Sequence, residues 1–183
     1  SGFVFLNNHV RHYPMPNFNG VRITVATSAG IVAFPELDVP SGAYAIWPVG
    51  AAIGSARLAW ATVQPLSRWT EGGATTWVGF THPAIAGKLA FRADSVSKLS
   101  CDCGTSRLEG DLWQVELPAD LVRTRILVTD SDGVERSLTV LAREEADRAS
   151  RVSFGGRERL AICKHALYAD GEALVGEAPA DED

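Results

Sequence analysis

The feature that most constrains this chain is a succession of short runs of β-branched and aromatic residues, separated by Gly, Pro, Asn and Asp. Runs of this length are typical of strands, and the residues between them tolerate the backbone conformations of turns. Val21, Ile23 and Val25 alternate with polar or small residues, which is the period of two expected of a half-buried strand. The pattern predicts an all-β fold.

Two turns predict local strand pairing. Residues 28–30 should turn the chain so that 21–27 and 31–34 form a hairpin, and Asp130 to Gly133 suits a second tight hairpin. We therefore expect an antiparallel β-sandwich of jelly-roll type, in which the strands on either side of such tight turns pair with each other. Strands are expected at 3–6, 21–27, 31–34, 43–47, 56–63, 75–81, 88–93, 112–117, 123–129 and 136–141.

One short helix is expected at 141–149, a stretch rich in Ala, Arg and Glu. It should connect the sandwich to a small extra strand pair. The predicted organisation is a sandwich over residues 1–148, a short β segment over 149–176 that either continues it or begins a following domain, and a disordered acidic tail over 177–183. Because an apolar run follows Ser1-Gly2 directly, we expect the native protein to continue upstream.

Composition and charge limit the classes of partner that the chain is expected to bind. The 183 residues carry a net charge of −5 with basic residues scattered singly, whereas a nucleic-acid surface needs clustered Lys and Arg. No apolar stretch approaches 18 residues, so no membrane partner is expected. At 46% hydrophobic residues the chain can bury a proper core without metals or disulfides. The parent's compartment stays open, and a periplasmic or secreted location is one option.

The sequence predicts neither a metal nor a cofactor. His9 and His12 have a helical i, i+3 spacing, but Pro14 prevents a helix there. Cys101 to Gly104 offers two thiols, lacks the remaining ligands of a tetrahedral site, and is interpreted as a hairpin turn. Nucleophile elbows and phosphate-binding loops are missing, and the carboxylates lie beside Gly, Pro or Ser in turns, so no catalytic residue is assigned.

Five tryptophans are many for this length, and exposed rings of this type stack on sugars. Trp47 and Trp60 lie in apolar runs and are expected to be buried. Trp69 lies in a polar stretch interpreted as a turn and is the best candidate for exposure. Trp69 and Trp77 are thus the candidate carbohydrate-binding residues, with β-galactosides or other oligosaccharides as possible ligands.

Several short segments occur in a recognisable order, namely 2–9, 11–14, 34–35, 39–44, 46–48, 57–58, 61–62, 141–145 and 156–160. In this order the chain resembles bacterial β-galactosidases of glycoside hydrolase family 35, in the β-rich region after the catalytic (β/α)8 barrel. The resemblance spans Gly2 to about Leu160. His9 stands where typical members have Tyr or a similar residue, and Cys101 to Cys103 matches nothing in the family.

The resemblance implies a parent enzyme that hydrolyses terminal β-galactosides with two glutamates on barrel strands. Those glutamates lie outside this chain, so it implies a non-catalytic accessory domain whose partner is the barrel of the same parent. Asn7, Asn8, His9 and Arg11 are candidates for a loop at the rim of the substrate pocket, or else an ordinary polar turn. This interpretation predicts an exposed apolar patch.

Two alternatives remain. A free-standing carbohydrate-binding module predicts coplanar exposed Trp rings on one face. An independent enzyme would need a carboxylate pair that no motif identifies.

Overall fold

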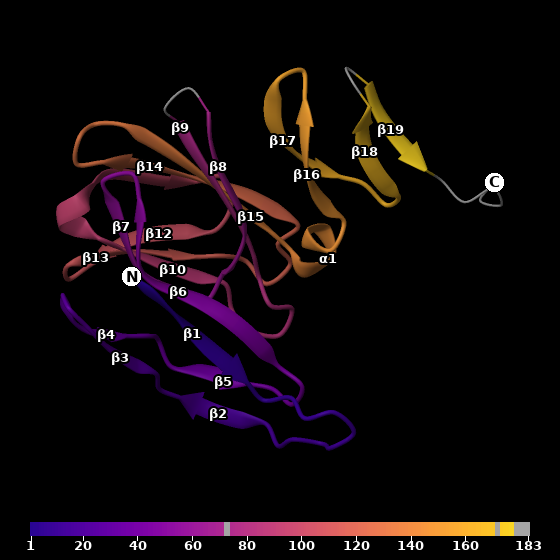
Figure 1. Ribbon diagram of the computed structural model, residues 1–183. Coiled ribbons are helices and arrows are strands. Elements are labelled where there is room, and N and C mark those ends of the chain that lie inside the picture. Colours follow the sequence, from indigo (N-terminus) through magenta and orange to yellow (C-terminus); the bar gives the residue numbers. More distant parts are fainter. Residues whose placement is uncertain (72–73, 171–172, 178–183) are drawn as a thin grey trace.

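The fold is an all-β sandwich, as the sequence predicts. The computed structural model describes residues 1–71, 74–170 and 173–177, and Figure 1 shows its two main sheets. The six-stranded sheet contains, in spatial order, β1 (Gly2–Asn7), β6 (Tyr44–Ile53), β7 (Ala56–Ala61), β10 (Lys88–Arg92), β13 (Leu112–Glu116) and β12 (Thr105–Glu109). The five-stranded sheet contains β11 (Val96–Cys101), β14 (Arg123–Asp130), β15 (Glu135–Leu141), β9 (Ala74–Phe80) and β8 (Gln64–Glu71).

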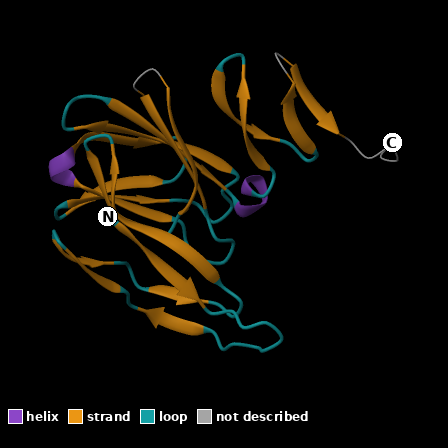
Figure 2. Cartoon of the chain, in the orientation of Figure 1, coloured by secondary structure: helices purple, strands orange, loops and turns teal. Residues whose placement is uncertain are grey.

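Two N-terminal strand pairs, the inner of which is a hairpin nested in sequence within the outer pair, form a further layer on the six-stranded sheet (Figure 1). They are β2 (Phe18–Val21) with β5 (Leu37–Val39), and β3 (Thr24–Thr27) with β4 (Gly30–Ala33). The β3–β4 pair confirms the hairpin predicted from residues 21–34. Helical turns among the described residues are limited to η1 (Ala93–Ser95) and α1 (Arg143–Ala146), as Figure 2 shows.

The layers enclose two cores. Side chains from both sheets, such as Leu58, Phe91 and Ile126, are fully buried between them. On the other side of the six-stranded sheet, Phe34 stacks on Trp47 at 5.9 Å between ring centroids, under the N-terminal strand pairs. Each large apolar side chain buried in this way stabilises the fold by about 1.5–3 kcal/mol. The cores fix which faces of β1 and β6 remain outside.

Several strand pairs join strands that are not neighbours in sequence, namely β1–β6, β2–β5, β7–β10, β10–β13, β11–β14 and β9–β15. β9 pairs in parallel with β15, so the sandwich is not purely antiparallel. Cys101 to Gly104 is not a hairpin turn: β11 pairs with β14 in one sheet, whereas β12 pairs with β13 in the other. The segment is a corner between the sheets, held where the Thr124 hydroxyl accepts the Cys103 N–H at 3.2 Å.

The predicted helix at 141–149 is wrong in extent, because only Arg143–Ala146 is helical. Leu141 pairs with Arg123 at the end of β15, and Ala149 pairs with Ile162 at the start of β16. Strand pairing and burial therefore override the helix propensity of the flanking residues. By contrast, the Asp130–Gly133 hairpin is confirmed, since it joins β14 to β15.

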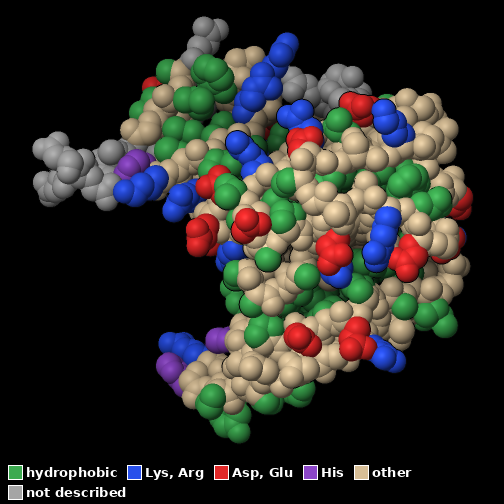
Figure 3. All heavy atoms as spheres, turned by 180° about the vertical axis from the view of Figure 1, so that it is seen from behind, with side chains coloured by type: hydrophobic (Ala, Val, Ile, Leu, Met, Phe, Trp, Pro, Cys, Tyr) green, Lys and Arg blue, Asp and Glu red, His purple; other side chains and the backbone are tan. Residues whose placement is uncertain are grey.

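The C-terminal region forms two hairpins where one strand pair was expected. They are β16 (Ala149–Phe154) with β17 (Arg157–Ile162), and β18 (Ala166–Asp170) with β19 (Ala173–Glu177). Glu177, the first residue of the predicted tail, ends β19, and residues 178–183 lie outside the described residues. Seen from behind, the surface is hollowed between these hairpins and the N-terminal layer (Figure 3).

Candidate functional site

An uncovered apolar surface lies on β1 and the first half of β6. Phe5 pairs with Ile46 and Asn7 pairs with Tyr44, so Phe3, Phe5, Tyr44 and Ile46 share one side of the sheet. We call these four residues the apolar face. Their exposed fractions are 55%, 74%, 53% and 42%. The alternate residues of β1 pack into the core beneath the N-terminal strand pairs, which leaves the apolar face to solvent.

The same strand presents an unprotected sheet edge. β1 lies at the end of the six-stranded sheet and contains no charged residue and no proline. Edge strands usually carry charges, prolines or bulges that prevent pairing with other chains. An exposed apolar edge without these devices is typical of an interaction surface. The combination of face and edge makes this the strongest candidate site for binding a protein partner.

The predicted rim-loop residues lie at the end of the apolar face, but not all of them are available. Asn7 is exposed, and its side-chain oxygen accepts the His9 N–H at 3.0 Å. The exposed His9 ring lies 6.4 Å from the ring of Tyr44. Arg11 is exposed and donates to His12 Nε2 at 3.1 Å. Three of the four predicted residues therefore reach the surface beside the face.

Asn8 is the exception, because its side chain is only 3% exposed. Its amide nitrogen donates to the carbonyl oxygens of Pro16 and Pro40, both at 2.9 Å. The side chain thus ties together the two ends of the N-terminal layer. The prediction that Asn8 contributes to a substrate rim is wrong, since a buried amide with this role cannot reach a ligand.

A polar cluster links the apolar face to α1. The Arg143 guanidinium lies 5.3 Å from the centre of the Phe80 ring and donates to Asp147 at 2.8 Å. Hydrogen bonding to Asp147, and further to Tyr44, raises the Arg143 pKa. Burial, and secondly the charge of Arg143, lowers the pKa of His82. Arg143 is therefore a fixed positive charge at the border of the apolar face.

Sequence reasoning missed this cluster. Tyr44, His82 and Arg143 belong to three distant segments, and only the folded sandwich brings them together. His82 lies before Pro83 in the loop that follows β9, is half-buried, and its Nδ1 accepts the Ala84 N–H at 3.1 Å. No local spacing could have revealed the proximity of Arg143.

The tryptophans do not form a platform. All five are described, and none is exposed. Trp77 is 7% exposed and contributes to the core between the sheets. Trp69 lies in strand β8 rather than in a turn, and its half-buried ring packs near Leu160 and Ile162. The expectation that Trp69 is an exposed turn residue is wrong, and Trp77 has no ring face available for a sugar.

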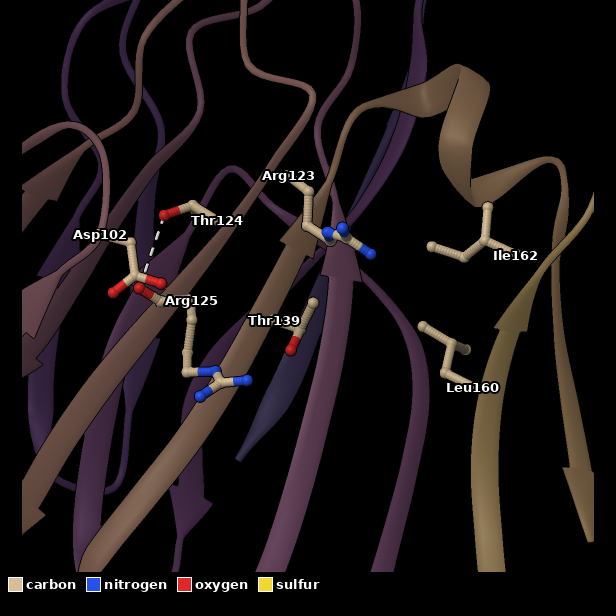
Figure 4. A pocket seen from close by; sticks show the side chains of 7 residues that line it. All are labelled: Asp102, Arg123, Thr124, Arg125, Thr139, Leu160 and Ile162. Atoms are coloured by element: carbon tan, nitrogen blue, oxygen red, sulfur yellow. Dashed lines mark hydrogen bonds between the residues drawn. The ribbon is translucent and has the colours of Figure 1, made fainter. Parts of the chain in front are cut away.

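A second surface feature is a groove between the five-stranded sheet and β17. It has a volume of about 560 Å³ and is lined by side chains from the two elements and from the Cys101–Gly104 corner (Figure 4). A larger hollow of about 1160 Å³ adjoins the β3–β4 hairpin. There Arg92 pairs with Asp111 at 3.0 Å, so its charge is neutralised within the protein. The groove-lining residues are Asp102, Arg123, Thr124, Arg125, Thr139, Leu160 and Ile162.

Within the described ranges, no group of three or more His, Cys, Asp or Glu side chains is arranged to hold a metal ion. Cys101, Cys103 and Cys163 are free thiols. Among the same residues, no helix has the length and apolar character needed to cross a membrane.

Comparison of the sequence with protein-family models gives no match, and no curated protein matches it either.

Proposed function

We propose that this chain is a non-catalytic accessory β domain of a β-galactosidase-type glycoside hydrolase, and that it packs through the apolar face on the (β/α)8 catalytic barrel. The observation that carries the proposal is the uncharged edge strand β1 with its exposed Phe3 and Phe5. Burying such side chains against a partner contributes about 25 cal/mol per Å² of apolar area. A larger protein partner supplies that area.

The family resemblance supports the same surface. Three of its segments, residues 2–9, 39–44 and 46–48, include all four residues of the apolar face. They also include His9, whose ring lies 6.4 Å from that of Tyr44 at the border of the face. The proposed partner surface is therefore apolar where it meets the apolar face.

The proposal assigns no chemistry to this chain. Retaining glycosidases need two carboxyl groups about 5–5.5 Å apart beside the substrate. The carboxylate of Asp130 is fully buried and accepts hydrogen bonds from three main-chain N–H groups and from Arg136, which commits it to structure. The function is support of the catalytic domain by packing.

The test is association with a separately produced catalytic barrel of a family 35 β-galactosidase, measured by sedimentation velocity. The pair Phe5→Ser and Ile46→Ser should weaken binding at least about tenfold, because both remove apolar contact area. Ile31→Ser is the matched control, since Ile31 is 79% exposed but lies on the β3–β4 hairpin.

Two results would contradict the proposal. One is the absence of any association with the barrel, or an equal loss of association in the Phe5→Ser and Ile31→Ser variants. The other is hydrolysis of a chromogenic β-galactoside by the purified chain alone, since the proposal expects none.

A further inference from the structure

The groove beside β17 has a charge pattern that the proposed function does not explain. Arg123 and Arg125 are two residues apart on β14, so both side chains stand on the outer face of the five-stranded sheet. Arg125 pairs across the sheet with Thr139 of β15. Figure 4 shows the two guanidinium groups on either side of Thr139, directed into the groove.

The two arginines differ from Arg92, which lines the larger hollow, and from Arg143 of α1. Within residues 1–71, 74–170 and 173–177, neither Arg123 nor Arg125 makes an ion pair, and neither guanidinium makes a hydrogen bond. Arg92 and Arg143, in contrast, are each paired with aspartates. The chain has a net charge of −5, yet this groove is lined by two arginines and a single carboxylate, that of Asp102.

The other walls of the groove indicate which groups a ligand should carry besides a negative charge. Leu160 and Ile162 of β17 form an aliphatic side opposite the sheet. The Thr139 hydroxyl can donate and accept hydrogen bonds, whereas the Asp102 carboxylate at the other end can only accept them. The groove thus combines positive charge, oxygen atoms that can accept hydrogen bonds from hydroxyl groups, and an apolar wall. Its volume of about 560 Å³ is within the roughly 300–1,000 Å³ of small-molecule sites.

We propose that this groove binds an oligosaccharide that carries carboxylate groups, of the uronic acid type. Arg123 and Arg125 bind the sugar carboxylate through the planar fork of the guanidinium. Asp102 and Thr139 accept hydrogen bonds from the sugar hydroxyls. Leu160 and Ile162 contact the C–H face of a ring. The site lies on a different sheet from the apolar face and does not depend on the proposed docking function.

Other anions fit the groove less well. A phosphate ion would use the arginines, but it would leave the aliphatic wall without a contact and would offer no sugar hydroxyls to Asp102 and Thr139. An acidic peptide offers carboxylates without the dense set of hydroxyl donors that Asp102 and Thr139 would satisfy. A neutral galactoside offers hydroxyls and no charge for the two arginines. Of these ligands, only a carboxylated sugar can contact the arginines, the hydrogen-bond acceptors and the aliphatic wall together.

The test is isothermal titration calorimetry of the full chain with trigalacturonate. Galactotriose, triglutamate and inorganic phosphate are the comparison probes. Trigalacturonate should bind saturably, and the comparison probes at least tenfold more weakly. Arg125→Gln and Arg123→Gln should each weaken trigalacturonate binding about tenfold or more, the expected effect of losing a hydrogen bond to a charged group.

Arg22→Gln is the matched control, because the Arg22 side chain is 81% exposed, lies on the N-terminal layer and carries the same charge. It should leave binding unchanged. Thermal unfolding of each variant verifies that the fold is intact. The proposal is overturned if trigalacturonate does not bind, if triglutamate or phosphate binds as tightly, or if Arg22→Gln weakens binding as much as Arg125→Gln.

Discussion

At the scale of single residues, Asp130 joins the two sheets through hydrogen bonds. Its carboxylate accepts main-chain N–H groups of Ser55 at 3.2 Å and Val134 at 2.9 Å, and Nε of Arg136 at 3.1 Å. Ser55 lies in the β6–β7 turn, whereas Val134 and Arg136 belong to the β14–β15 hairpin. Burial by itself raises the Asp130 pKa, but these hydrogen bonds outweigh it and the pKa is lowered.

Replacing Asp130 by Asn should therefore lower the free energy of unfolding by about 3 kcal/mol, because Arg136 and three main-chain N–H groups lose a charged acceptor. The folded pKa lies below the ordinary value of 3.8, so this stabilisation is present above pH 3.8 and is lost as the pH falls below it. Urea denaturation at neutral pH and along an acid series measures both effects. The exposed Asp120→Asn control should change stability by less than about 0.5 kcal/mol. Equal losses in the two variants would contradict the argument.

At the scale of elements, local pairing could be predicted from the sequence and long-range pairing could not. The β3–β4 and β14–β15 hairpins carry their own turn residues, so their strands identify each other within a few positions. The parallel β9–β15 pair has no such signal, because burial of Trp77 beside Leu138 selects it only after the sheets assemble. The hairpin predicted at the Cys101–Gly104 corner was wrong for the same reason. A tight turn has the same residue pattern whether its two strands pair with each other or belong to different sheets.

The corner makes a prediction of its own. Gly104 has a φ of +105°, and a Cβ there would lie 2.5 Å from the Glu116 carbonyl oxygen. Gly110 has a φ of +60° with nothing within 4 Å of its Cβ position. Gly110→Ala should cost only the backbone strain, about 1 kcal/mol, whereas Gly104→Ala should cost at least about 2 kcal/mol more because β12 must move. Chemical denaturation of both variants compares them, and similar losses would show that the corner is not tightly packed.

At the scale of the whole molecule, the candidate sites depend on how the layers meet. The sequence identified Asn7, His9 and Arg11 because they follow an apolar strand directly, and it could not identify Asn8 as buried. The Arg143 cluster and the arginine groove each need elements far apart in sequence, namely β6 with α1, and β14 with β17. Periodicity indicates which face of one strand is apolar, but not which other element leaves that face uncovered.

The C-terminal hairpins contribute unequally to the molecule. Leu160 and Ile162 of β17 pack against Val78 and Leu141 on the outer face of the five-stranded sheet. The described residues of β18 and β19 add no member to any of the three buried clusters. Residues 149–165 therefore stabilise the sandwich, whereas residues 166–183 should be dispensable for its folding.

Two truncations test this difference by urea denaturation monitored through tryptophan fluorescence. A chain that ends at residue 165 should unfold within about 1 kcal/mol of the full chain. A chain that ends at residue 148 should lose about 2–4 kcal/mol, because two large aliphatic side chains leave the outer face of the sheet. It should also lose the wall formed by Leu160 and Ile162, and with it most of the trigalacturonate binding. Equal stability of the 148-residue chain and the full chain would instead assign residues after 148 to a separate folding unit.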